Sequence, residues 1–111
     1  MFKRLAFFEG KIRDGCEDEF DRYINTNLVP LWTRLPGATG VELLREVEAE
    51  EGSHRYPFVL QVTFPDRAAI EQMLASPIRY ESREVTKGLL ELFEGRVFHV
   101  IYDLHAHKMA G

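Results

Sequence analysis

The hydrophobic residues of this 111-residue chain recur with two alternating periods, and the order of these periods constrains the fold more than any other feature. A period of two, typical of β-strands, marks residues 2–8, 38–47, 57–64 and 96–104. A period of 3.6, typical of α-helices, marks the segments that follow the first and the third of these strands. The order strand, helix, strand, strand, helices, strand predicts a single α+β domain over residues 1–111.

This order of elements is that of the ferredoxin-like split βαβ fold. Right-handed crossovers would place both helical segments on one face of a four-stranded antiparallel sheet, with the strand order 4-1-3-2. In the third strand, alternate residues form a fully apolar face that suits packing under the helices: Phe58, Leu60, Val62 and Phe64. In the fourth strand we expect the same of Phe98, Val100, Tyr102 and Leu104.

The opposite face of the predicted sheet carries too few charges for a face that meets water. Its expected members are Val59, Gln61 and Thr63 from the third strand, and Val97, His99, Ile101 and Asp103 from the fourth. A second copy of the chain is the simplest cover for such a face. We therefore expect a homodimer that is joined mainly by sheet faces and buries at least ~1,600 Å² in total.

The first helical segment contains a proline in its middle. Apolar residues recur at helical spacing from Phe20 to Leu35, and Pro30 lies within this pattern. A proline cannot donate the helical hydrogen bond, and its ring crowds the preceding turn. We therefore expect the helix to kink or to restart near residues 26–29.

Composition and charge exclude several classes of protein. The single Cys16 excludes an intrachain disulfide and a cysteine-clustered metal site, which favours a reducing, cytoplasmic location. A net charge of −4 argues against nucleic acid as the main partner. No apolar run is long enough to span a membrane, and no signal peptide opens the chain.

Several short motifs resemble those of a known family. Residues 20–37 contain Phe-x-x-Tyr, then Pro-Leu, then Arg-Leu-Pro-Gly, and this run resembles the first-helix motif of EthD-like proteins. Residues 74–77 (Leu-Ala-Ser-Pro) and 92–97 resemble the second half of the same pattern. The resemblance implies a dimeric α/β barrel, a superfamily that includes 4-methylmuconolactone methylisomerase and antibiotic-biosynthesis monooxygenases.

One position departs from that pattern. Such proteins commonly carry a histidine two residues before the motif proline, and a gap-free match places Leu28 there. The imidazole that could act as an acid, a base or a ligand is absent at this position. This departure favours a binding module over an enzyme, and the sequence leaves both classes open.

His99 is the candidate catalytic residue, because histidine exchanges protons near neutral pH. It could act as a general base, with Gln61 and Thr63 on the same face of the sheet. Asp103 is four strand residues away, about 13 Å, which is too far for a direct contact. The alternative, which we favour, is an interface histidine that forms hydrogen bonds across the dimer.

A ligand pocket is predicted where the first helical segment breaks. Tyr23, Asn27 and Trp32 lie around Pro30, and a broken helix often lines a pocket between helix and sheet. We expect a cavity of roughly a few hundred Å³ with Asn27 as its main polar anchor. Its walls would also include Phe58, Tyr102 and either Phe7 or Phe8. The alternative is that Tyr23 and Trp32 belong to the core and that the asparagines cap the break.

Metal binding is not expected. Asp103, His105 and His107 alternate along one strand, but they lie near the end of the chain and lack a firm third ligand. No glycine-rich phosphate loop or dinucleotide fingerprint is present, so we expect no cofactor. The sequence thus predicts a protein that binds or transforms a small apolar or aromatic, oxygen-bearing metabolite. The alternative is a non-catalytic homodimeric module that binds a ligand or a partner protein.

Overall fold

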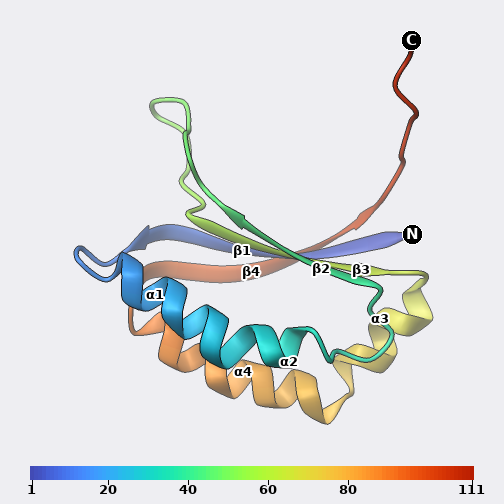
Figure 1. Ribbon diagram of the computed structural model, residues 1–111, viewed down its shortest axis with the longest axis horizontal. Helices are drawn as coiled ribbons and strands as arrows, with labels where there is room; N and C mark the ends of the chain where they lie inside the picture. The colour runs from blue at the N-terminus through green and yellow to red at the C-terminus, as the bar shows by residue number, and fades with distance from the viewer.

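The computed structural model describes residues 1–111 as a four-stranded antiparallel sheet whose helices all cover one face (Figure 1). The order β2-β3-β1-β4 is the predicted 4-1-3-2 order, so the prediction of a ferredoxin-like α+β fold is confirmed. The strands are β1 (Phe2–Ile12), β2 (Gly40–Arg45), β3 (Phe58–Phe64) and β4 (Phe93–Asp103). The helices are α1 (Glu17–Tyr23), η1 (Ile24–Leu28), α2 (Val29–Trp32), α3 (Arg67–Leu74) and α4 (Pro77–Leu90).

The hydrophobic core lies between the sheet and the helices. All four residues of the apolar face predicted for β3 are buried there, which confirms that prediction. Phe8 packs edge-on against Phe58 with ring centroids 5.1 Å apart, and Phe20 from α1 lies 6.0 Å from the same ring. Aromatic rings therefore join β1 and β3 to the first helical segment.

The break around Pro30 is present, and it takes the form of a π-helical turn. The π-helix η1 covers Ile24–Leu28 and leads directly into the single turn of α2, where Pro30 occupies an early position. The first N–H groups of a helix have no partner within that helix, so the missing N–H of a proline costs little at this position. The restarted turn directs Trp32 toward the sheet, where its ring stacks on Phe58 at 6.1 Å.

The prediction for the faces of β4 is wrong. β4 pairs with β1 so that Val97 lies opposite Phe8 and His99 lies opposite Ala6. Residues directly opposite each other in a pair point to the same side of the sheet, and Phe8 and Ala6 belong to the buried core. Val97, His99 and Ile101 therefore face the helices, whereas Phe98, Val100, Tyr102 and Leu104 belong to the alternation that faces away.

This error has a physical cause. Both faces of β4 carry apolar residues, so hydrophobicity alone does not distinguish them. The register is fixed by the partner strand and by Phe93 at the start of β4, which is buried opposite Ile12. Counting in twos from Phe93 brings His99 to the helix side.

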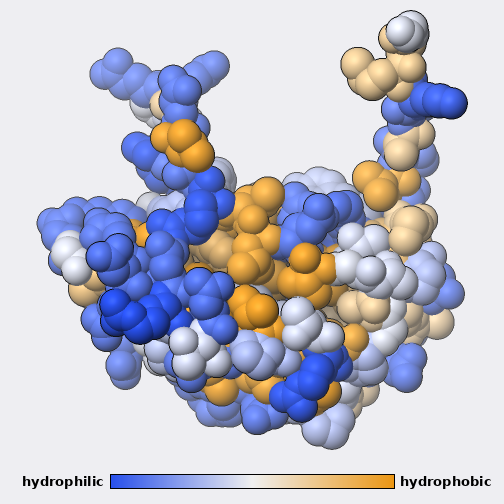
Figure 2. All heavy atoms as spheres, in the orientation of Figure 1, coloured by the Kyte–Doolittle hydropathy of each residue, from blue (hydrophilic) through white to orange (hydrophobic).

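The face of the sheet opposite the helices, which we call the open face, has no helix upon it (Figure 1). Phe7 and Phe98 stack on it with centroids 5.3 Å apart, and Tyr56 packs edge-on against Phe7. The β2–β3 loop and the C-terminal segment both project from this side (Figure 1). Hydrophobic residues are visible between the bases of these two projections (Figure 2). Val59 and Gln61 lie on the open face as predicted, because they pair with Phe7 and Leu5.

Candidate functional site

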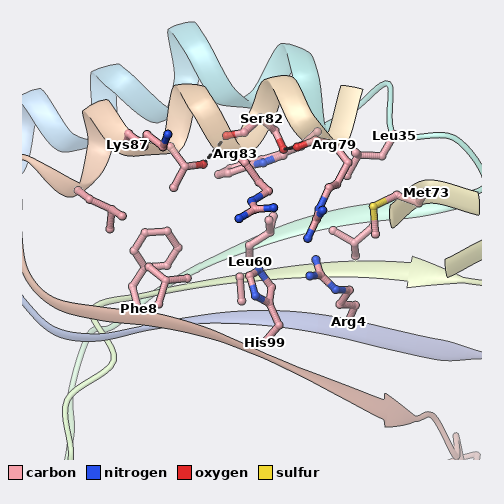
Figure 3. Close-up of a pocket in the computed structure, with 16 residues that line it drawn as sticks. Arg4, Phe8, Leu35, Leu60, Met73, Arg79, Ser82, Arg83, Lys87 and His99 are labelled. Carbon is pink, nitrogen blue, oxygen red and sulfur yellow. Dashed lines mark hydrogen bonds between the residues drawn. The ribbon is translucent and has the colours of Figure 1, made fainter. Parts of the chain in front are cut away.

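A partly open cavity of about 420 Å³ lies between the sheet and α4 (Figure 3). Strands β1, β3 and β4 form its floor, and one side of α4 forms its roof. Most of its walls are apolar: Ala6, Phe8, Trp32, Leu35, Leu60, Val62, Met73, Leu90 and Val97. A cavity of the expected size is therefore present between helices and sheet, but its lining places it under α4 rather than under the break at Pro30.

The cavity also carries a cluster of basic side chains. Arg79, Arg83 and Lys87 recur every four residues along α4, which places them on one face of that helix. Arg4 rises from the floor on β1, where it shares the strand face of Ala6 and Phe8. None of the sixteen residues that line the cavity is acidic, although the chain as a whole has a net charge of −4.

Most of these basic groups have no carboxylate partner. Arg4, Arg79 and Arg83 form no ion pair, whereas Lys87 is paired on the surface with Glu84 at 3.0 Å. Their guanidinium groups approach the same region of the cavity from opposite walls, with Arg4 below and Arg79 and Arg83 above (Figure 3). The three groups form a positively charged centre within apolar walls, which we call the arginine cluster.

The electrostatics of the site follow from this arrangement. Burial, and then the positive charge of Arg79, lowers the pKa of Arg4 to about 10. Partial removal from water, and then the charges of Arg4, Arg79 and Arg83, lowers the pKa of His99 to about 4, although its side chain remains accessible to solvent through the partly open cavity. At neutral pH Arg4 is therefore charged and the imidazole of His99 is neutral.

His99 lies on the floor of the cavity below the arginine cluster (Figure 3). Its neutral ring offers one hydrogen-bond donor and one acceptor. The hydroxyl hydrogens of Ser82 and Thr86 on the roof are already used, because they are donated to main-chain carbonyls of α4 at 2.9 and 2.6 Å. The hydrogen-bond donors that remain free in the site are thus those of the arginine cluster and His99.

Three of the residues proposed from the sequence line this cavity. Trp32 closes part of the wall, and His99 forms part of the floor. Phe8, which was offered as an alternative to Phe7, also lines it, while Phe7 lies on the open face. The prediction that placed His99 in the dimer interface is corrected by the register of β4.

The other four proposed residues lie outside the cavity. Tyr23 donates its hydroxyl to the carbonyl of Val85 at 2.7 Å, where it joins the first helical segment to α4. Phe58 is 1% exposed and is covered by neighbouring rings. Asn27 points to solvent from η1, and Tyr102 lies on the open face. Asn27 is therefore not the polar anchor of the cavity.

Sequence reasoning missed the arginine cluster. The signal was present in β1, because Arg4 shares a face with Ala6 and Phe8 and interrupts an apolar alternation. The spacing of Arg79, Arg83 and Lys87 also places three cations on one side of α4.

The remaining polar groups form no metal site. Asp103 and His105 are 3.1 Å apart on an exposed segment, and nowhere do three histidine, cysteine or acidic side chains meet in an arrangement that could hold a metal ion. No helix is both long and apolar enough to cross a membrane.

Fold and site together define a ferredoxin-like α+β protein with an arginine-lined cavity between sheet and helices. Among solved structures, it is similar to an EthD-family protein from Bacillus halodurans, with a TM-score of 0.73 at 18% identity over 95% of this chain and 99% of that one. A dimeric ferredoxin-like protein of unknown function from Jannaschia has a TM-score of 0.65 at 23% identity, over 93% of this chain and 98% of that one.

An antibiotic biosynthesis monooxygenase is also similar, with a TM-score of 0.63 at 20% identity over 96% of this chain and 100% of that one. The resemblance to EthD-like proteins is thus confirmed as a likeness of fold. No protein-family model matches the chain, and no curated protein matches it either.

Proposed function

We propose that this protein binds a small apolar or aromatic, oxygen-bearing metabolite in the cavity under α4. The observation that carries the proposal is the cavity itself, a space of about 420 Å³ with apolar walls and a few convergent polar groups. Ligand sites are commonly clefts of about 300–1,000 Å³ with this division between apolar area and orienting groups. The indole of Trp32 supplies a flat wall for a ring.

The environment of His99 favours a role in holding the ligand. A pKa of about 4 leaves the imidazole a much weaker base at neutral pH than an ordinary histidine. Its neutral ring can instead accept a hydrogen bond from a ligand hydroxyl or donate one to a ligand oxygen. Ligand positioning is therefore the role that we propose for His99.

Binding is tested by nuclear magnetic resonance with 2-naphthol and 2-naphthamide, two neutral oxygen-bearing aromatic probes. Trp32 is the only tryptophan of the chain and lines the cavity, so its indole N–H signal reports occupancy directly. We expect this signal to shift in a saturable manner. An unchanged indole signal at millimolar concentrations of both probes, and of the acidic probes used below, would contradict the proposal.

A matched pair of variants on β4 locates the binding. Val97→Phe introduces a bulky ring into the cavity, whereas Val100→Phe introduces the same ring on the opposite side of the same strand. Both variants keep Trp32 as the only tryptophan, and we expect Val97→Phe to abolish probe binding and Val100→Phe to leave it intact. The reverse result would place the site on the open face.

We further propose that the open face is covered by a second copy of the chain. The stacked rings of Phe7 and Phe98 form a half-buried apolar surface that no helix covers, with only Tyr56 and Arg96 packed against it. The similar protein from Jannaschia is described as dimeric. Light scattering should give twice the mass of 12.9 kDa at micromolar concentration, and Phe98→Asp should shift the mass to that of one chain. A wild-type protein that runs as a monomer would refute the proposed dimer.

A further inference from the structure

Building on the proposed ligand site, we infer that its ligand is an organic oxyanion. An apolar or aromatic body would occupy the apolar walls, and a carboxylate or phosphate group would be bound by Arg4, Arg79 and Arg83.

The first support is the convergence of charge from separate elements. Arg4 belongs to the first strand of the sheet, whereas Arg79 and Arg83 belong to a helix 75 and 79 positions further along the chain. Their guanidinium groups nevertheless point into one region of one cavity (Figure 3). Guanidinium groups bind carboxylate and phosphate oxygens through parallel hydrogen bonds, so three of them around one space suit such a group.

The second support is the absence of any internal counter-charge. Four of the seven arginines outside the cluster pair with carboxylates: Arg13 with Glu94, Arg45 with Asp21, Arg55 with Glu46 and Arg96 with Glu9. The chain has eighteen acidic residues against fourteen lysines and arginines, so acidic side chains are not scarce. The cavity has none.

The third support is the mutual repulsion within the cluster. Positive charges held together and partly removed from water are costly until an anion joins them. Burial lowers the pKa values of Arg4 and His99 most, and the repulsion lowers them further. A bound anion would offset the repulsion, so it would raise the pKa of His99, and binding near pH 5 would be accompanied by proton uptake.

The apolar walls favour an organic anion over an inorganic one. Leu60 and Val62 from β3 and Met73 from α3 line the same space as the arginines. An inorganic anion would leave this apolar surface in contact with water. An anion with an attached apolar body would cover it and gain the corresponding hydrophobic free energy.

The test compares three probes that share one ring system: 2-naphthoate, its neutral and nearly isosteric carboxamide 2-naphthamide, and 2-naphthyl phosphate. Affinities are measured by calorimetry at pH 7.5 and low salt, with the Trp32 indole signal as a check on location. We expect one of the two anions to bind at least about 10-fold more tightly than the amide, because hydrogen bonds to charged groups are the stronger ones. The anion that binds more tightly indicates whether the ligand carries a carboxylate or a phosphate group.

Three variants test whether the preference for an anion over the amide comes from the arginine cluster. Arg79→Gln removes one guanidinium group from the cavity, and Arg22→Gln makes the same change of charge on the exposed surface of α1. We expect Arg79→Gln to weaken the preferred anion by about 10- to 100-fold and to leave the amide unchanged. Arg22→Gln should alter neither affinity. If Arg79→Gln fails to fold, Arg83→Gln serves in its place, because Arg83 is exposed along one side.

The outcomes separate this inference from the proposed function. Equal affinities for both anions and the amide, or an anion preference that survives both arginine variants, would overturn the inference and leave the ligand site standing. Failure of all three probes and of 2-naphthol to bind would overturn both, whereas binding of 2-naphthol alone would overturn only the inference. Inorganic phosphate alone binding as tightly as 2-naphthyl phosphate would also overturn the inference, because the apolar walls would then contribute nothing.

Discussion

Gly88→Ala should destabilise the protein, although the same substitution usually stabilises a helix. Gly88 lies near the C-terminal end of α4, and a glycine there costs roughly 0.5–1 kcal/mol relative to alanine. A Cβ atom at this position, however, would lie 2.1 Å from the hydroxyl oxygen of Tyr23 and 2.7 Å from its Cζ atom. Atoms do not approach so closely, so the tyrosine ring would have to move.

The displacement has two costs. The hydroxyl of Tyr23 would lose its 2.7 Å hydrogen bond to Val85, which is worth roughly 0.5–1.5 kcal/mol. Repacking of an overfilled contact typically costs about 1–3 kcal/mol. After the gain in helix propensity is subtracted, we expect the free energy of unfolding to fall by about 2 kcal/mol.

Urea denaturation at one fixed protein concentration measures this change, and a second background tests its cause. In Tyr23→Ala the ring is gone, so Gly88→Ala should there raise the free energy of unfolding by roughly 0.5–1 kcal/mol. The sign of the effect should thus reverse between the two backgrounds. An increase in stability with Tyr23 present would refute the reasoning.

Two further perturbations have defined outcomes. The folded pKa of His99, about 4, lies below its ordinary value of 6.5. The unfolded state therefore takes up a proton first as pH falls, so the free energy of unfolding should decrease between about pH 6.5 and pH 4 and should not change through this group above pH 6.5. Urea midpoints between pH 4 and 7.5 should therefore fall more steeply for the wild type than for His99→Gln, and parallel profiles would contradict the lowered pKa. Asp66 accepts a hydrogen bond from the main-chain N–H of Ala69 at 2.8 Å as the N-cap of α3, so Asp66→Ala should lower the free energy of unfolding by about 1 kcal/mol. Thermal melting would detect this loss, and an unchanged melting temperature would mean that the cap contributes nothing.

Sequence reasoning succeeded where one side of an element is much more apolar than the other. The alternation in β3 predicted its buried residues, because Gln61 and Thr63 mark the opposite side clearly. The proline at position 30 predicted a break because its chemistry forbids an unbroken α-helix. The break takes the form of a five-residue π-helix, which no local sequence pattern predicted.

The same reasoning failed where both sides of an element are apolar or where a charge faces inward. In β4 the correct assignment required the pairing with β1, which is a long-range property. Arginines at positions 79 and 83 fit the ordinary pattern of a solvated helix face, so their position over the cavity depends on how α4 lies upon the sheet. Arg4 was the exception, because it interrupts an apolar face of a central strand.

Successive residues of β4 belong to two different chemical environments. Val97 and His99 contribute to the cavity, while Phe98 and Val100 contribute to the open face. Alternate residues of this one strand therefore belong to two different surfaces. The sheet is a single layer that separates the cavity from the open face, so a substitution on one side can change one surface and leave the other unchanged. An insertion has a larger effect, because one added residue within β4 would move every following side chain to the opposite face of the sheet. This strand should therefore tolerate changes of residue far better than changes of length.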